Sequence, residues 1–333
     1  MYILAFETSC DDTSVAIMRD NICIALSTRT QLEHSVTGGV VPEVAARSHA
    51  NAIFPCIEDV LKEADITLDD IDVIACTEKP WLLPSLLTGM TVASTLALSL
   101  HKPLIWIDHI ESHIFANYLE REESDILFPA VVLTVSGWHT EIYFWKSIFE
   151  LHLLGQTRDD AAGEAFDKVS KMMWLWFPGG AIVSNRAKVY EEQHRDISPK
   201  SKNSKPLFPE VLLEKESLDF SFSWIKTAVK REIDRRIEKY WFLSEEDIGE
   251  IAYEFEEVMT TILCKKLLRA TLQTDAEMMI LAWGVSANSK LRSKLETVAR
   301  EQDILFISPV KNIYSMDNAA MVGIRAYYKY QYL

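Results

Sequence analysis

The sequence is poor in glycine, in paired cysteines and in positive charge. Glycine supplies 11 of 333 residues, about 3% against a usual share of ~7%. The five cysteines are scattered and form no CxxC pair, which argues against a disulfide framework or a structural zinc site and predicts a reducing, cytoplasmic compartment. We expect that no apolar run reaches the length of a membrane span, and the chain starts directly with a predicted strand, so we expect neither a membrane segment nor a signal peptide.

The formal net charge is −15, which makes the chain a poor generic binder of nucleic acid, since phosphate affinity comes from lysine and arginine. One basic cluster lies on a predicted helix whose apolar side carries isoleucine and valine at helical spacing. Its members are Lys226, Lys230, Arg231, Arg235, Arg236 and Lys239. An RNA-binding patch is one interpretation. The other is a solvated helix face whose charge is offset by Glu232, Asp234 and Glu238.

Strands in threes followed by alternating helix and strand occur twice, which predicts an α/β protein with a mixed sheet in each of two lobes. We expect a first lobe over residues 1–115 and a second over 116–314, with a last helix at about 315–330 packing back on the first. The first lobe should contain strands at 3–8, 14–18, 22–30, 71–76 and 104–107, and helices at 42–63 and 84–100. The second should contain three strands between 129 and 155, helices at 161–173, 180–192, 223–240 and 244–271, a strand at 278–282, a helix from 287 and a strand at 304–306. Residues 198–206 have the composition of a surface linker.

A strand–turn–strand pattern occurs once near the N-terminus and again at the start of the second lobe. Ser9 aligns with Ser136, and Thr13 aligns with Thr140. Each copy is a β-run, a short polar turn and a second β-run. The duplication predicts two homologous lobes whose turns face one cleft and bind a nucleotide-like ligand, because backbone N–H groups in such turns suit phosphate oxygens.

His109 and His113 are four residues apart, which places two imidazoles on one face of a helix at metal-ligand spacing. A zinc peptidase would need a glutamate directly after the first histidine. The acid here is Glu111, two positions on, so it points away from both imidazoles and a peptidase is disfavoured. A third ligand must come from elsewhere in the chain, and Asp317 is a candidate.

Three further segments resemble nucleotide contacts when they are taken in order. Asp167 lies one turn into a helix that begins after a run of acids, and it suits the hydroxyls of a ribose. Gly180 opens another helix in a Phe-Pro-Gly-Gly sequence, where glycine lets a ligand approach the backbone. Asn288 follows a buried strand in a strand–turn–helix arrangement.

Together these motifs make the chain resemble the tRNA threonylcarbamoyladenosine transferase family, from Leu4 to about Ala326. The resemblance rests on the segments FETSCDDTSVAI, GGVVPEVAARSH (38–49), HIESH, VSGxHT, DDAAGEAFDK, FPGG, DFSFSxIKTAV (219–229), GVSAN and DNAAM (317–321). It implies the duplicated actin/Hsp70/sugar-kinase fold (ASKHA). It also implies transfer of a threonylcarbamoyl group from threonylcarbamoyl-AMP to the exocyclic amine of the adenosine 3′ of the anticodon, in tRNAs that read codons starting with A.

The resemblance also implies roles for particular residues. The metal ligands of one divalent ion, iron or zinc, would be His109, His113 and Asp317, and the catalytic acids would be Asp11 and Asp12. The threonylcarbamoyl-adenylate would be held by Thr134, Val135, Ser136, Gly137, Trp138, Asp167, Gly180 and Asn288. The implied partners are tRNA, a homologous inactive paralogue (TsaB-like) and a small ATPase (TsaE-like).

Tryptophan is the departure from the family, with 9 residues. Six of them stand in family motifs, at places most of which are typically glycine in the family: Trp81, Trp138, Trp174, Trp176, Trp224 and Trp283. Trp106, Trp145 and Trp241 also occupy positions where glycine would be natural. Our hypothesis is that a codon read as glycine in the host, such as UGA, has been rendered as tryptophan; the nine would bring glycine to 20, close to the usual share. The alternative is a degenerate paralogue whose ligand site is plugged by Trp138.

Two rival functions remain open at this point. A sugar kinase would share the superfold but has no use for the triad of His109, His113 and Asp317. An inactive scaffold subunit, like the family's shorter paralogue, would lack the histidine pair that this chain keeps.

Overall fold

The computed structural model describes residues 1–31, 40–176, 178–194, 206–209 and 216–332. Within these residues the chain forms two compact units, Met1–Ile126 with Pro309–Leu333, and Leu127–Ser308. The boundaries thus fall at 126/127 and 308/309, where the sequence suggests 115/116 and 314/315. The linker at 198–205, Gly38, Gly39 and Phe177 lie outside the described residues.

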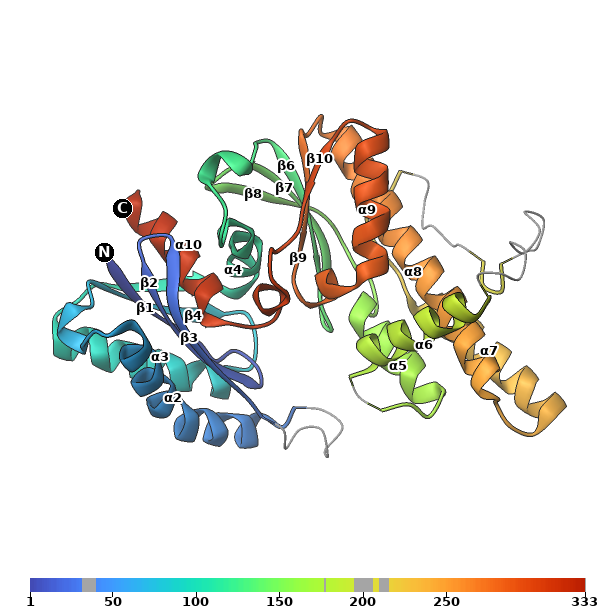
Figure 1. Cartoon of the computed structure of the whole chain (residues 1–333), viewed down its shortest axis with the longest axis horizontal. Coiled ribbons are helices and arrows are strands. Elements are labelled where there is room, and N and C mark those ends of the chain that lie inside the picture. Colours follow the sequence, from blue (N-terminus) through green and yellow to red (C-terminus); the bar gives the residue numbers. More distant parts are fainter. Residues whose placement is uncertain (32–39, 177, 195–205, 210–215, 333) are drawn as a thin grey trace. The chain divides into compact units, whose positions relative to one another are not determined.

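Unit 1 is a five-stranded mixed sheet with helices on both faces (Figure 1). Its strands are β1 (Tyr2–Glu7), β2 (Asp12–Arg19), β3 (Ile22–Thr30), β4 (Val73–Lys79) and β5 (Leu104–Asp108), in the order β3-β2-β1-β4-β5. Its helices are α2 (Pro42–Ala64), α3 (Leu83–Leu100), α4 (His109–Phe115) and α10 (Ala319–Gln331), with short 3₁₀ turns η1 (Leu68–Asp70), η2 (Ala116–Tyr118), η3 (Glu123–Asp125) and η5 (Asn312–Ser315).

Alternation along β1 explains how both faces of this sheet are covered. Leu4 and Phe6 belong to the core shared with α2 and α3, while Ala5 points to α10 on the other side. Gly323 of α10 lies so close to the sheet that a Cβ there would come 2.4 Å from the Met18 side chain. Helix α10 therefore packs tightly across β1 and β2, which holds its N-terminal end over the edge of the sheet.

Unit 2 repeats the topology of unit 1. Its strands are β6 (Ala130–Val135), β7 (Thr140–Ser147), β8 (Glu150–Gln156), β9 (Met278–Ala282) and β10 (Leu305–Ile307), in the order β10-β9-β6-β7-β8. In both units the first three strands are antiparallel, and the first strand pairs in parallel with the fourth. The equivalence of β1 with β6 and of β2 with β7 shows that the repeated hairpin is a true structural duplication.

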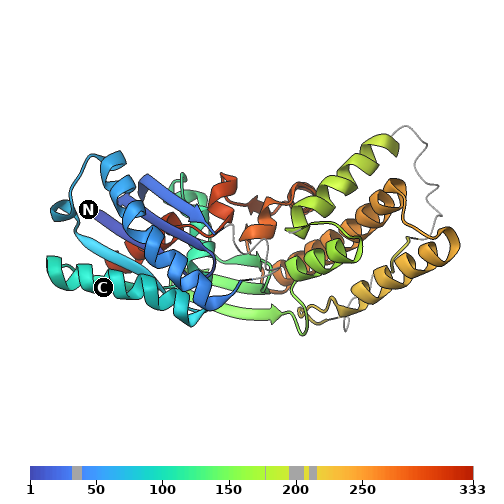
Figure 2. The ribbon, with the colours of Figure 1, turned by 90° about the horizontal axis from the view of Figure 1, so that it is seen from below.

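The helices of unit 2 are α5 (Ala162–Met172), α6 (Gly179–His194), α7 (Ser223–Tyr240), α8 (Glu245–Gln273) and α9 (Ser289–Glu301), with a 3₁₀ turn η4 (Gly284–Ala287). Helix α6 runs beside α8 in both views (Figures 1 and 2). The predicted α/β fold is confirmed, and most element bounds agree within a few residues. The last helix begins at Ala319 rather than near Tyr314, because residues 312–315 form η5 and the Asn318 side chain caps α10.

Helix α3 corrects one expectation from the sequence. Its 18 residues carry no charge, and by length and composition alone it is long and apolar enough to cross a bilayer. The expectation that no apolar run reaches this length was therefore wrong. In the structure α3 packs against α2 and β4, so it covers one face of the sheet of unit 1.

Candidate functional site

The parallel strands of unit 1 bring three polar residues to one edge of the sheet. Glu7 ends β1, Thr77 lies near the end of β4, and Asp108 ends β5. Helix α4 begins directly after β5, and the Asp108 side chain caps it by accepting from the N–H groups of Ile110 and Glu111 at 2.9 and 3.1 Å. The cap sets the start of the helix, so that His109 is its first residue.

His109, His113 and Asp317 form a compact group at this edge. The Nε2 atoms of the two imidazoles are 3.2 Å apart, and Asp317 Oδ1 lies 3.0 Å from His113 Nε2 and 3.5 Å from His109 Nε2. One ligand atom from each residue lies within 4.8 Å of the others. Both histidines are buried and the carboxylate is 20% exposed. Three donors of this kind converging on one point fit a divalent metal ion with positions left open.

Asp317 reaches the histidines because the start of α10 is tied to the sheet. The Asn318 side chain accepts from the N–H of Met321 at 3.1 Å, and the N–H of Ala319 donates to Ser14 Oγ on β2 at 2.9 Å. Asp317, which directly precedes the capping residue Asn318, is thereby held beside α4.

Burial and charge act against each other in this group. Burial alone would raise the pKa of Glu7, but the charge and hydrogen bond of His109 outweigh it and lower that pKa. Burial likewise opposes protonation of His109, yet Glu7 and Asp317 raise its pKa above the ordinary value. Burial lowers the pKa of His113 to about 4, although the Asp317 carboxylate, which accepts a hydrogen bond from the imidazole, opposes this shift. His113 is therefore neutral at physiological pH, the state that a metal ligand needs.

Asp11 and Asp12 lie where β1 turns into β2. The turn is held by His49 of α2, whose ring nitrogens lie 2.8 Å from Thr13 Oγ1 and 3.0 Å from the Cys10 carbonyl oxygen. Burial raises the pKa of Asp12 to about 7, with further contributions from neighbouring acids that include Asp317. Its Oδ1 atom is buried and has no hydrogen-bond partner among the described residues. Such a carboxyl group is suited to take up a proton near neutral pH.

In unit 2 the equivalent turn follows β6. Thr134 and Val135 are the last, buried residues of that strand. Ser136 closes the turn, because its hydroxyl accepts from the N–H groups of Trp138 and His139 at 3.1 and 3.0 Å. A Cβ at Gly137 would meet no atom within 4 Å, so its backbone faces open space.

The other predicted contacts of unit 2 lie on segments that join this turn. The N–H of Gly163 at the start of α5 donates to the Ser136 carbonyl oxygen at 3.1 Å. Asp167 of α5 accepts from the N–H of Gly179 at 2.7 Å, and burial raises its pKa although the N-terminal N–H groups of α6 oppose the rise. A Cβ at Gly180 would also meet open space.

Asn288 joins the same group from the strand side, but its amide is already engaged. Its Oδ1 caps α9 by accepting from the Leu291 N–H, and its Nδ2 donates to Ser184 of α6 and to Glu256 of α8 at 3.0 and 2.7 Å. The ring of Trp283 stacks on His139 at 5.4 Å. All the predicted ligand residues of unit 2 thus lie on four segments in mutual contact.

The basic cluster on α7 is largely paired with acids. Arg236 is buried and donates to Glu232, Asp247 and Glu250. Further pairs join Lys226 to Asp160, Lys230 to Asp234 and Arg235 to Glu232. These contacts favour a solvated helix face whose positive charge is neutralised by acids, rather than an RNA-binding patch.

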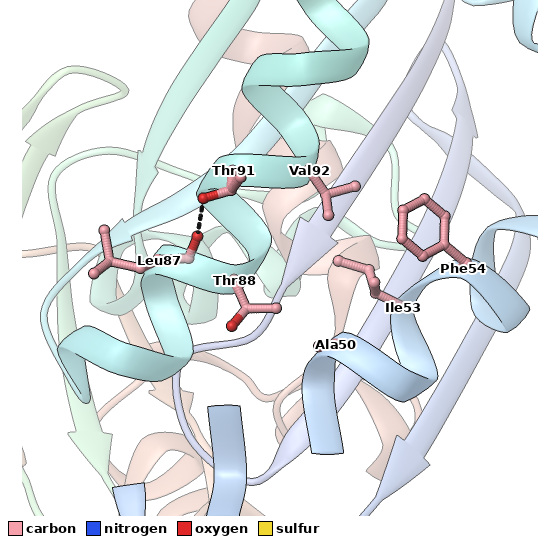
Figure 3. Close-up of a pocket in the computed structure, with 7 residues that line it drawn as sticks. All are labelled: Ala50, Ile53, Phe54, Leu87, Thr88, Thr91 and Val92. Atoms are coloured by element: carbon pink, nitrogen blue, oxygen red, sulfur yellow. Dashed lines mark hydrogen bonds between the residues drawn. The ribbon is translucent and has the colours of Figure 1, made fainter. Parts of the chain in front are cut away.

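A shallow groove of about 390 Å³ lies between α2 and α3, away from the histidines (Figure 3). Ile53, Phe54, Leu87 and Val92 supply its apolar walls, and Thr88 and Thr91 lie along it. The Thr91 hydroxyl donates to the Leu87 carbonyl of its own helix at 2.6 Å. The groove brings no titratable group together.

Sequence reasoning missed Glu7, Thr77 and His49, which hold the predicted residues in place. A signal for Glu7 existed, because it is a charged residue at the end of the otherwise apolar strand Tyr2–Glu7. Thr77 and His49 carry no local signal, since their roles depend on neighbours far away in sequence.

Two solved structures have the same overall fold. HypF from T. kodakarensis matches 98% of this chain and 48% of its own length, with a TM-score of 0.54 and 14% identity. The activator of the 2-hydroxyisocaproyl-CoA dehydratase from Clostridium difficile, with bound ADPNP, matches 99% of this chain and 96% of its own, with a TM-score of 0.50 and 13% identity. At such identities the likeness establishes the ASKHA-type fold and nothing further.

Sequence comparison identifies the family. The model of the TsaD family, described as tRNA N6-adenosine threonylcarbamoyltransferase, matches residues 23–324. Proteins with that name from Staphylococcus haemolyticus (strain JCSC1435) and Staphylococcus aureus (strain JH9) are 39% and 38% identical over 331 residues, which cover 99% of this chain and 91% and 92% of theirs. The chain therefore belongs to the tRNA N6-adenosine threonylcarbamoyltransferase family.

Proposed function

We propose that this protein transfers the threonylcarbamoyl group of threonylcarbamoyl-AMP to the exocyclic amine of the adenosine 3′ of the anticodon, in tRNAs reading codons that start with A. The observation that carries the proposal is the buried group of His109, His113 and Asp317 in a chain that matches this family over nearly its whole length. The group argues against both a sugar kinase, which has no use for it, and an inactive scaffold subunit.

The three residues would hold one divalent ion, iron or zinc. Two imidazoles and one carboxylate leave coordination positions open, and the ion would supply Lewis acidity toward an oxygen of the substrate. The protein contributes a dry site and neutral His113, because burial keeps water away and lowers the pKa of that imidazole.

The turns of unit 2 would hold the adenylate. Gly137 and Gly180 leave open space at the backbone, which lets N–H groups approach phosphate oxygens. Asp167 would accept from ribose hydroxyls, and Thr134, Val135, Ser136 and Trp138 would line the turn. Asn288 would act mainly by joining its turn to α6 and α8, because its amide already bonds Ser184 and Glu256.

The acids of unit 1 would move the proton. The amine nitrogen of the adenosine attacks the carbamate carbonyl carbon, a new N–C bond forms, the C–O bond to phosphate breaks, and AMP leaves with the electron pair. Asp12 would take the amine proton through its unpartnered Oδ1, since its pKa of about 7 matches neutral pH. Asp11, one residue earlier, would assist by raising the local negative charge.

The proposed partners are tRNA, a homologous inactive paralogue and a small ATPase. A net charge of −15 and the pairing of the α7 cations with acids support a tRNA surface shared with a partner. All five cysteines are free thiols, which agrees with the proposed reducing cytoplasm.

The test is tRNA-dependent release of AMP. The purified protein, with its proposed partners, is mixed with threonylcarbamoyl-AMP and a tRNA that carries the target adenosine, and AMP is measured by chromatography. A matched tRNA with that adenosine replaced by guanosine is the control. We expect release with the first tRNA only; equal release with both would show hydrolysis rather than transfer and would contradict the proposal.

A further inference from the structure

Glu7 is a fully buried carboxylate with three hydrogen-bond donors around it. Its Oε1 accepts from the Ser9 N–H at 2.6 Å, and its Oε2 accepts from Thr77 Oγ1 at 2.6 Å. The same Oε2 lies 2.9 Å from Nδ1 of His109. Both oxygens are therefore engaged, and the carboxylate is held in one orientation between the ends of β1, β4 and β5.

The two nitrogens of His109 face different neighbours. Nδ1 faces the Glu7 carboxylate at 2.9 Å and the Ser9 hydroxyl at 3.2 Å, whereas Nε2 faces Asp317 and the Nε2 of His113. A carboxylate that accepts from one ring nitrogen fixes the tautomer and leaves the lone pair of the other nitrogen for a ligand. Glu7 itself lies on the Nδ1 edge of the ring, so the imidazole separates it from the point where the three donors meet.

We propose that Glu7 is a positioning residue that holds His109 with a proton on Nδ1, so that Nε2 is its metal-binding atom. The inference rests on the metal site proposed above. Ser9 and Thr77 contribute by orienting the carboxylate. The competing explanation is that Glu7 only satisfies buried donors at the sheet edge, which would leave metal affinity and the His109 tautomer unchanged when it is replaced.

The test combines calorimetry with zinc ions and ¹⁵N NMR of histidine-labelled protein. In the zinc-loaded protein, His109 should show a protonated Nδ1 and a metal-bound Nε2. Glu7→Gln should weaken zinc binding by about 10–100-fold, the usual effect of losing such a partner. Glu111→Gln is the matched control, because Glu111 lies two residues from His109 but pairs with Arg325; its zinc affinity should match that of the wild type.

Thr77→Val is a milder variant in case Glu7→Gln does not fold. It keeps the carboxylate but removes one of its donors, so a smaller loss of zinc affinity is expected. Wild-type zinc affinity in Glu7→Gln, or zinc bound through Nδ1, would overturn the role of Glu7 while leaving the metal site in place. Failure of the wild-type protein to bind zinc at all would remove the metal site and the inference together.

A second inference comes from the backbone at the tryptophans. Among the described residues, ten that are not glycine have a positive φ, and four of these are tryptophan: Trp81 (127°), Trp174 (57°), Trp241 (70°) and Trp283 (76°). Four of the other six are aspartate, a residue that tolerates the left-handed region because its short side chain bonds locally. A bulky residue has no such compensation.

Two of the four backbones are suited to glycine alone. Trp283 combines φ 76° with ψ −176°, a region in which a Cβ is strongly disfavoured. The φ of Trp81 lies far beyond the left-handed helical range. The other two end helices: Trp174 follows α5, where the Leu175 N–H bonds the Ser170 carbonyl, and Trp241 caps α7 in the left-handed region. Both are positions at which helices commonly carry glycine.

Exposure supports the same conclusion at the helix ends of unit 2. Trp174, Trp176 and Trp241 are 69%, 85% and 89% exposed, and they border a cavity of about 670 Å³ together with Phe242. So much exposed indole on one unit is unusual for a protein surface. Glycine at 174 and 241 would relieve the backbone and remove most of this apolar surface at once.

We infer that the cell that makes this protein incorporates glycine at positions 81, 174, 241 and 283. The direct test is the mass of the peptides covering these positions in protein isolated from the native host. Glycine at all four is expected, and tryptophan at any of them would overturn the inference for that position.

A stability series gives an independent test with recombinant protein. Trp174→Gly and Trp241→Gly, whose side chains are 69% and 89% exposed, should each raise Tm, by about 2–4 °C for the relief of one left-handed residue. Trp145→Gly is the matched control: Trp145 is buried on β7 against Phe128 and has no left-handed backbone, so its Tm should fall. A fall in Tm for Trp174→Gly and Trp241→Gly would contradict the inference at those two positions.

Discussion

The turns that follow β1 in unit 1 and β6 in unit 2 occupy equivalent places in a duplicated fold but are built differently. In unit 1 the residues around the turn converge, because His109 contacts both Glu7 and Asp317. In unit 2 the turn instead has open space at Gly137. The backbone is strained in both units just after the fourth strand, at Trp81 in unit 1 and at Trp283 in unit 2. Duplication thus preserved the strand order while the two turns differ in their side chains, with the proposed metal ligands in one unit and the proposed phosphate-binding turns in the other.

The largest effect is expected in unit 1. His113→Ala removes one of two imidazoles from a buried group, so the bound ion should be lost, and with it several kcal/mol of transition-state stabilisation. Metal content by elemental analysis and the transfer rate should fall together. Full transfer by a metal-free His113→Ala protein would show that the group is not the metal centre.

Asp12 should control the pH dependence. A base acts in its deprotonated form, so the rate should rise as the pH passes through about 7, the raised pKa of Asp12, and level off above it. Asp12→Asn should slow transfer by about 10²–10⁴-fold and remove this rise. Single-turnover rates across the pH range check both points; an unchanged profile in Asp12→Asn would assign the proton to solvent or to another group.

In unit 2, Asp167→Ala should weaken binding of threonylcarbamoyl-AMP by about 1.5–3 kcal/mol, the value of a hydrogen bond that involves a charged group. Calorimetry measures the change. Asp234→Ala is a suitable control, because Asp234 lies on the exposed face of α7 in the same unit and pairs with Lys230. Equal affinity in both variants would remove Asp167 from the ligand contacts.

The smallest effect is expected at the tryptophans in the turns of unit 2, where the volume of the side chain and the strain of the backbone can be tested separately. Trp138 does not have a positive φ, and it is 65% exposed and beside the open space at Gly137. Trp138→Gly should therefore improve adenylate affinity several-fold by freeing volume for the ligand, with no contribution from backbone strain. Adding Trp283→Gly and Trp224→Gly should raise the transfer rate further. If the unaltered protein transfers as fast as the triple variant, the tryptophans do not obstruct the ligand.

Periodicity and the repeated hairpin were enough to predict the α/β fold and most of the elements. The histidine pair was also readable, because spacing on a helix is a local property. Asp317 was a candidate third ligand, but no local pattern singles it out, because its approach to the histidines depends on a hydrogen bond between Ser14 and the start of α10, far along the chain. The basic residues of α7 suggest an RNA-binding patch for a related reason. Some of the acids that pair with Arg236 lie on α8, so the sequence of α7 alone does not reveal that its charge is neutralised.

The central claim is that this chain attaches threonylcarbamoyl to a single adenosine of tRNA, and nucleoside analysis tests it most directly. tRNA incubated with the protein, its partners and threonylcarbamoyl-AMP is digested to nucleosides and examined by liquid chromatography with mass spectrometry. The account predicts threonylcarbamoyladenosine from the position 3′ of the anticodon and its absence with the His113→Ala protein. Unmodified adenosine at that position with the wild-type protein, while AMP is still released, would contradict it.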